Sequence, residues 1–378
     1  FRINELVEDY KTKDISILTS YPSYPNYNKF KNFKKNQDIN FIKSKIYRMP
    51  VFPRSNSNIS ILLNYTSFII CSFFYGFYVF FKKKIDLIFI FCPSPILSAI
   101  PIIFLNKLFK KKVVIWVLDL WPNTIIDLKI IKNKYIINLL KKIVNFIYNN
   151  CDLILAQSES MKKEITSISS TKCIYFPSWP ESKISDDKLE DYPDTSRKKN
   201  KKTLRIMFAG NIGEAQSLET IIDATLILKK DIKLEWLIVG DGRWKSFLNN
   251  IVIKKELENE IKFFKSVPIS KIQSYFDQAD ALYLGLKNNP TFQKTIPGKL
   301  STYMSSGKPI IASISGEVFD IIKKAHCGLV SAGENSKELA ENIKKFYNFS
   351  QEHRNNLGSN GLIFSQKYFN KKIIFENL

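Results

Sequence analysis

The chain has 378 residues, which favours two domains over one, and 45% of them are hydrophobic, which excludes a largely disordered protein. The five cysteines are scattered and form no Cys-x-x-Cys pair, so neither a disulfide framework nor a zinc framework is expected. Only two histidines occur, which argues against a histidine-rich metal site.

The net charge is +22 at pH 7, and most of it lies in the first half of the chain. Residues 1–203 contain 33 Lys and Arg against 17 Asp and Glu. This excess favours an anionic partner such as a membrane surface or a lipid diphosphate. A composition rich in Lys, Asn and Ile equally fits a solvated surface, so both interpretations stay open. Nucleic acid is not an expected partner, because no helix-turn-helix, zinc-finger or RNP pattern occurs.

Apolar runs alternate with amphipathic segments in the first half, as in parallel βαβ units. Strands are predicted at 15–19, 46–49, 87–91, 113–118, 153–156 and 173–176, and helices at 59–81, 95–110, 133–149 and 158–166. The chain opens at Phe1 with helix-like residues 2–10, whereas a doubly wound domain normally opens with a strand and a glycine loop. We therefore expect a short N-terminal piece to be missing.

The segment 59–81 contains no charged residue over 23 positions, which meets the transmembrane length criterion of ~20 residues. Three interpretations are open: a membrane span, a helix that dips into the membrane, and a core helix. Two lysine clusters would face anionic headgroups in the second case. The predicted membrane-facing residues are Lys82, Lys83, Lys84, Lys110, Lys111 and Lys112.

Residues 181–203 are polar and charged, as expected of an interdomain linker. The alternation of strands and helices then restarts more regularly. Strands are predicted at 204–209, 234–239, 261–264, 281–284 and 309–312, and helices at 217–229, 244–256, 270–278 and 298–306. A second doubly wound domain would bind its ligand beyond the carboxyl ends of these strands.

Three glycine turns follow strands of the second half, at 210–213, 240–243 and 297–299. Glycine lets the backbone approach a ligand closely, and a helix start offers unpaired N–H groups. Lys299 adds a positive charge, and Arg243 could reach a phosphate oxygen, although an exposed arginine at a helix start is equally ordinary. The three turns together predict a receptor for a diphosphate.

The order of these motifs resembles a known family. The segments AGNIGEAQSLETIIDA, LIVGDGRWKSFL, TIPGKLSTYMSSGKPIIA and AHCGLV are similar to the C-terminal domain of GT-B glycosyltransferases of family 4. In the first half, RSNSNISILLNYTSF, PSPILSAIP and WVLDLWPNT resemble the same bacterial surface-polysaccharide branch, which is typified by L-fucosamine and colanic-acid transferases.

The resemblance implies an α/β GT-B fold, with two doubly wound Rossmann-like domains that face a cleft. Residues 1–180 would form the acceptor-side domain and residues 181–203 the linker. Residues 204–362 would bind the nucleotide sugar, and residues 363–378 would form a helix that packs back toward the N-terminal domain. An NAD-dependent dehydrogenase is disfavoured, because the chain has no Gly-x-Gly-x-x-Gly followed by a ribose-binding carboxylate.

The resemblance also assigns a set of donor-binding residues. Family members typically carry two glutamates at the positions of Lys294 and Thr302, and this chain has neither. Thr302 could still bind the ribose through its hydroxyl. The expected donor-binding residues are Gly210, Asn211, Gly213, Gln216, Arg243, Lys294, Pro297, Gly298, Lys299 and Thr302.

Two carboxylates are predicted to be catalytic on the same basis. Asp119 aligns with the family's acceptor-domain His-Asp motif, with Leu118 at the histidine position, and could stabilise an oxocarbenium ion or orient a sugar hydroxyl. Capping a helix is the alternative role for Asp119. Glu317 is the second candidate.

The resemblance implies a retaining transfer of a hexose, N-acetylated or deoxy, from a UDP-linked donor. The acceptor would be a glycan or a polyprenyl-diphosphate-linked glycan in O-antigen, capsule or exopolysaccharide synthesis. No metal or other cofactor is expected, and the protein would lie in the cytoplasm against the inner face of the plasma membrane. The alternative is a catalytically altered protein that only binds the nucleotide sugar.

Overall fold

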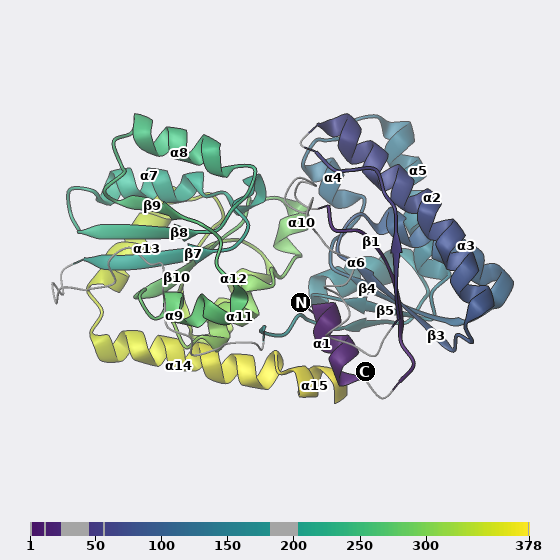
Figure 1. Ribbon diagram of the computed structural model, residues 1–378. Coiled ribbons are helices and arrows are strands. Elements are labelled where there is room, and N and C mark those ends of the chain that lie inside the picture. Colours follow the sequence, from purple (N-terminus) through teal and green to yellow (C-terminus); the bar gives the residue numbers. More distant parts are fainter. Residues whose placement is uncertain (1, 11–12, 24–44, 56, 182–202, 377) are drawn as a thin grey trace. The chain divides into compact units, whose positions relative to one another are not determined.

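The computed structural model describes residues 2–10, 13–23, 45–55, 57–181, 203–376 and 378 (Figure 1). It divides into two compact units. Unit 1 comprises Phe1–Gln157 and Met161–Tyr175, and unit 2 comprises Ser158–Ser160 and Phe176–Leu378. Nearly all of the predicted linker, residues 182–202, lies outside the described residues.

Unit 1 contains two parallel sheets instead of one continuous sheet. The smaller pairs β1 (Ser16–Ser20) with β2 (Lys45–Met49). The larger has the order β3 (Leu87–Cys92), β4 (Lys112–Val117), β5 (Leu153–Ala156) and β6 (Cys173–Tyr175). Buried Val, Ile and Ala side chains of β4 and β5 form its core with α3 and α5, as expected for strands that are covered on both faces.

The helices of unit 1 follow the strands in βαβ order. They are α1 (Arg2–Asp9), α2 (Asn58–Lys82), η3 (Ile96–Ala99), α3 (Ile100–Phe109), α4 (Asn123–Asp127), α5 (Lys134–Asn149) and α6 (Glu159–Ile168). Ser57 caps α2 by accepting the Ser60 N–H. Gly76 lies where α2 crosses α3, and a β-carbon there would stand 2.8 Å from the Cδ1 of Ile102. The missing side chain therefore lets the two helices pack closely.

Unit 2 is a six-stranded parallel sheet in the order β12-β11-β10-β7-β8-β9. The strands are β7 (Leu204–Ala209), β8 (Leu234–Val239), β9 (Ile261–Phe264), β10 (Ala281–Gly285), β11 (Ile310–Ser313) and β12 (Gly328–Ser331). The strand order reverses between β7 and β10. The carboxyl ends of these two central strands are where such a sheet binds ligands.

Helices cover both faces of this sheet (Figure 1). They are η4 (Glu214–Gln216), α7 (Glu219–Leu228), α8 (Lys245–Lys254), η5 (Ile269–Lys271), α9 (Ile272–Phe276), α10 (Pro290–Gln293), α11 (Lys299–Ser305), α12 (Glu317–Ala325), α13 (Ser336–Tyr347), α14 (Gln351–Tyr368) and α15 (Lys371–Glu376). Side chains of α7, α8 and α13 share one buried core with the sheet. Phe375 of α15 packs edge-on against Phe176 and Trp179 of the same unit.

The α/β class and the predicted strands are confirmed, mostly to within one residue. The C-terminal helix predicted to begin at residue 363 is wrong, because residue 363 falls inside α14. Gly358 and Gly361 both lie within that helix. A β-carbon on Gly358 would stand 1.9 Å from the Gly307 carbonyl oxygen, so this glycine serves close packing and not a chain break.

Candidate functional site

Two glycine loops of unit 2 press against each other at the carboxyl ends of β7 and β8. Gly210 and Gly240 both have positive φ, +141° and +146°. A β-carbon on Gly240 would lie 1.9 Å from the Gly210 carbonyl oxygen, and one on Gly242 would lie 2.1 Å from the Ile212 carbonyl oxygen. No side chain fits at these positions without moving the backbone. The predicted turns at 210–213 and 240–243 therefore pack directly against each other, backbone to backbone.

Lys299 reaches into this structure from the start of α11. Its Cε would lie 2.4 Å from a β-carbon on Gly210, so the lysine occupies the space that the glycine leaves open. Its Nζ donates to Oε1 of Gln216 at 2.5 Å and lies 4.5 Å from the ring centroid of Phe208. The sequence predicted that Gly210, Gln216 and Lys299 share one site, and the structure brings them together.

Burial governs the charge on Lys299. Desolvation lowers the pKa of this ammonium to about 7, and no carboxylate contributes to that shift. An ammonium in this state is stabilised by an arriving anion, which would raise its pKa again. The site is therefore suited to a phosphate or diphosphate group.

The remaining residues of the glycine turns at 210–213 and 297–299 lie near this lysine. Among the described residues, no acceptor receives the N–H of Gly213 or of Gly298. The side-chain amide of Asn211 lies over Gly213, 3.0 Å from where a β-carbon would stand. The Pro297 carbonyl accepts the Leu300 N–H at 2.9 Å, which closes the turn that opens α11.

Three other predicted donor residues are placed less decisively. Arg243 is exposed in the β8–α8 loop, next to Trp244, whose N–H donates to the Ile212 carbonyl. Lys294 is the partly buried C-cap of α10. The Thr302 hydroxyl donates to the Gly298 carbonyl at 3.4 Å, so its hydrogen is directed back into its own helix.

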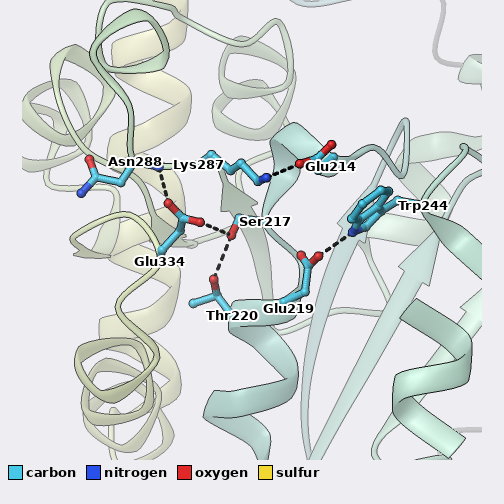
Figure 2. Close-up of polar contacts among 8 residues, drawn as sticks. All are labelled: Glu214, Ser217, Glu219, Thr220, Trp244, Lys287, Asn288 and Glu334. Carbon is cyan, nitrogen blue, oxygen red and sulfur yellow. Dashed lines mark hydrogen bonds and ion pairs between the residues drawn. The ribbon is translucent and has the colours of Figure 1, made fainter. Parts of the chain in front are cut away.

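A polar cluster that the sequence did not reveal holds the neighbouring loops (Figure 2). The carboxylate of Glu334 accepts the Asn288 N–H at 2.8 Å and the Ser217 hydroxyl at 3.4 Å. It thereby joins the β12–α13 loop to the loops that follow β10 and β7. Glu334 has a positive φ of 64°, unusual for a non-glycine residue, which no sequence motif signals.

Two further contacts hold η4 and α7 (Figure 2). Lys287 forms an ion pair with Glu214, and the Nε1 of Trp244 donates to Oε1 of Glu219 at 2.5 Å. The Lys287 N–H also donates to the Ala215 carbonyl at 3.0 Å. The short helix between Gly213 and Ser217 is therefore fixed from both sides.

Asp119 lies in unit 1, directly beyond the end of β4. It accepts hydrogen bonds from the Thr124 hydroxyl and, at 3.2 Å, from the Nε1 of Trp121. Trp121 also donates to the Ser94 hydroxyl at 3.0 Å, on the loop after β3. Desolvation raises the pKa of Asp119, and these donors partly oppose the rise. The N-cap of α4 is Pro122, with no side-chain capping bond, so Asp119 does not cap that helix.

Glu317 is the first residue of α12 and follows Gly316, which has a φ of +79°.

Within the described ranges, no three His, Cys, Asp or Glu side chains gather as a metal site. The expectation that no cofactor is needed remains a prediction.

Three of the six predicted membrane-facing lysines have a polar side-chain partner. Lys83 pairs with Asp14 at 3.1 Å, and Lys112 pairs with Asp152 at 2.7 Å. Lys82 donates to the Tyr78 hydroxyl at 2.7 Å. Lys84 and Lys110 have exposed side chains, and Lys111 is partly buried.

Most of unit 2 is similar in sequence to a known family of proteins. Residues 193–363 match the family described as glycosyl transferases group 1. Unit 2 is therefore similar to glycosyl transferases group 1 over most of its length.

The chain is 24% identical over 249 residues to the probable glycosyltransferase WbjE of Pseudomonas aeruginosa, covering 62% of this chain and 59% of WbjE. It is 25% identical over 285 residues to the putative colanic acid biosynthesis glycosyl transferase WcaI of Escherichia coli, covering 69% of this chain and 65% of WcaI. The chain thus spans less than two thirds of the length of each of these relatives.

A solved structure has a similar fold over nearly the whole length of the chain. Anabaena HepE in complex with UDP-glucose has a TM-score of 0.63 and 14% identity, covering 96% of this chain and 98% of HepE. At that identity the likeness concerns the fold. The fold is GT-B, as expected, and the residues similar to glycosyl transferases group 1 make up most of its second Rossmann-like unit.

Proposed function

We propose that this chain is a glycosyltransferase that moves a hexosyl group from a nucleotide sugar to a glycan acceptor. One observation supports this most: Lys299 lies against Gly210 and Gln216 at the carboxyl end of β7, within the residues similar to glycosyl transferases group 1. The donor diphosphate would bind there, on the Lys299 ammonium and the N–H groups of Gly213 and Gly298. Arg243 would add a further cation.

The chemistry follows from where charge develops. Cleavage of the donor bond leaves negative charge on the diphosphate, which a preorganised ammonium and backbone N–H groups stabilise. In a retaining transfer, the acceptor hydroxyl would attack from the face that the diphosphate leaves, and a diphosphate oxygen would take its proton. Asp119, held by Trp121 and Thr124, would orient the acceptor or stabilise the positive charge on the sugar, with Glu317 as a further candidate.

The finer assignments rest on the relatives. UDP is the proposed nucleotide, because HepE of the same fold was solved with UDP-glucose. WbjE and WcaI carry names that support a role in bacterial surface-polysaccharide synthesis, such as O-antigen, capsule or colanic-acid-like polymers. We propose an N-acetylated or deoxy hexose as the sugar and a polyprenyl-diphosphate-linked glycan as the acceptor. The enzyme would lie in the cytoplasm against the anionic inner face of the plasma membrane.

The alternative is a catalytically altered protein that binds a nucleotide sugar without transferring it. The residues at 294 and 302 favour this alternative, since Lys294 is not a carboxylate and the Thr302 hydroxyl is bonded to Gly298.

Calorimetric titration with UDP, GDP, ADP and dTDP tests the donor site. We expect selective binding of UDP, weakened about tenfold or more in Lys299→Met, because a charge-assisted hydrogen bond is lost. Lys254→Met, at the end of α8, is the matched control and should bind normally. If none of the nucleotides binds, the proposed function is wrong.

Donor hydrolysis and transfer separate the two alternatives. The enzyme should release UDP from a UDP-hexose, faster when lipid-linked acceptors are present. Asp119→Asn should abolish transfer while leaving UDP affinity unchanged, since Asp119 belongs to unit 1. Tight UDP binding without turnover on any acceptor would favour the binding protein.

A further inference from the structure

Helix α2 presents an unusually apolar surface. It is 25 residues long, and in its most apolar window only 22% of the residues are buried. Large side chains on it are well exposed, among them Leu62 (65%), Ile70 (52%), Phe74 (66%) and Phe81 (70%). A core helix of a soluble protein would bury such residues. The core-helix interpretation of this segment is therefore not supported.

The exposed surface continues onto α3. Phe104 and Leu108 of α3 are 56% and 70% exposed, and Phe73 of α2 packs against Phe104 with ring centroids 6.3 Å apart. An open groove of about 320 Å³ runs between the two helices. All of its lining residues are apolar and include Ile69, Ile70, Phe73 and Phe74 of α2 with Pro101 and Phe104 of α3. The groove therefore offers no hydrogen-bonding side chain to a sugar or a nucleotide.

The stretch of sequence that contains α2 and α3 is strongly basic, although Asp14 and Asp152 from elsewhere in the chain pair with Lys83 and Lys112. Residues 45–112 contain ten Lys and Arg and one acidic residue, Asp86. Helix α2 ends at Lys82 and α3 at Phe109. The basic residues at or just beyond the C-terminal ends of these two adjacent helices are Lys82, Lys84, Lys110 and Lys111. Exposed apolar rows with lysines beside them are typical of helices that lie in the interface of an anionic bilayer.

The groove is also connected to the Asp119 cluster within unit 1. Helix α3 begins directly after η3, which follows Pro95 and Ser94. The Ser94 hydroxyl accepts from Trp121, and Trp121 also donates to Asp119. A lipid held between α2 and α3 would therefore lie near the loop that supports this carboxylate.

We infer that the α2–α3 surface docks on an anionic lipid bilayer and that its groove takes one hydrocarbon chain of a bilayer lipid. The lysines bind the headgroups, and the apolar rows enter the boundary between headgroups and chains. This inference rests on the proposed function only in that the acceptor is membrane-bound. Lipid binding and UDP binding are measured separately, so either can fail alone.

A tryptophan placed in the groove tests the occupant. The emission of Phe104→Trp should be quenched in vesicles of phosphatidylglycerol and phosphatidylcholine whose chains are brominated. It should not be quenched in vesicles of brominated phosphatidylcholine alone, which lack the anionic headgroup. Phe247→Trp, on an exposed position of α8 in unit 2, is the matched reporter and should not be quenched. The wild-type signal of the five native tryptophans is subtracted from both.

Two sets of substitutions assign the contributions. Each of Lys84→Gln and Lys110→Gln should lower the vesicle partition coefficient about fivefold. Ile70→Ser with Phe74→Ser should lower it about tenfold or more, whereas Ile227→Ser with Ile253→Ser in unit 2 should leave it unchanged. UDP affinity should be unaffected in every variant, and thermal unfolding should show that unit 1 of each variant still folds.

Two results would overturn the inference. One is self-association without lipid: the emission of Phe104→Trp would change with protein concentration, and sedimentation would show a dimer. That result would identify a second copy of the chain as the occupant of the groove. The other is a protein that neither sediments with anionic vesicles nor shows quenching.

Discussion

The Cε of Lys299 fills the space beside Gly210 that any β-carbon on that residue would enter, at 2.4 Å. The glycine is therefore needed for two reasons, its positive φ and the lysine that crosses it. These two requirements can be separated experimentally, because another glycine of unit 2 has only the first.

Gly210→Ala should displace the Lys299 ammonium and weaken UDP binding about tenfold or more. Gly307→Ala is the control: its φ is +71°, but a β-carbon there meets nothing within 4 Å. Both variants should lose about 1–3 kcal/mol of unfolding free energy from backbone strain. Calorimetry and thermal unfolding measure the two effects. Equal UDP affinity in the two variants would contradict the placement of Lys299.

The lowered pKa of Lys299 predicts that UDP binding depends on pH. In the free protein this pKa is about 7, far below that of an unfolded lysine, so the unfolded chain holds the extra proton between those values. Stability should therefore rise with pH from about 7 to about 10. UDP affinity should run the other way and fall above about pH 7, because the diphosphate needs the protonated ammonium.

Proton uptake gives a direct measure of the same linkage. At about pH 8.5, where UDP is fully ionised, its binding should take up about one proton, seen as a dependence of the binding enthalpy on buffer ionisation. Lys299→Met should remove this uptake. Equal uptake in wild type and variant would show that another group titrates.

Glu334 should position the loops beside the donor site. Glu334→Ala removes the acceptor of the Asn288 N–H and of the Ser217 hydroxyl, which should lower the unfolding free energy by about 1–2 kcal/mol and weaken UDP binding. Glu334→Gln keeps one acceptor oxygen and should restore part of both. Glu341→Ala, exposed on α13, is the control for losing a carboxylate. A purely structural role would lower stability and leave UDP affinity unchanged.

The sequence predicted the parts of the site that depend on local pattern. Strands β7, β8 and β9 are mainly apolar runs, each with one charged residue near its start, and the turns after β7 and β8 are marked by glycines that the backbone requires. The contact between Lys299 and Gln216 joins residues 83 positions apart. It was accessible only because the order of motifs resembled a known family.

Other features depend on pairings that no local pattern records. The Glu334 cluster joins positions 117 residues apart and contains no glycine or proline signature. In unit 1, sequence periodicity could not show that β1 and β2 form a separate sheet, since strand order is a tertiary property.

Gly76 joins α2 to the rest of unit 1. Because α2 packs against α3 through this glycine, it cannot cross a bilayer without leaving the helical layer to which it belongs. Detaching it would expose the side of α3 that it now shields. In the proposed docking, adsorption of the intact folded unit would need no such detachment and would leave the sheet that carries Asp119 undisturbed.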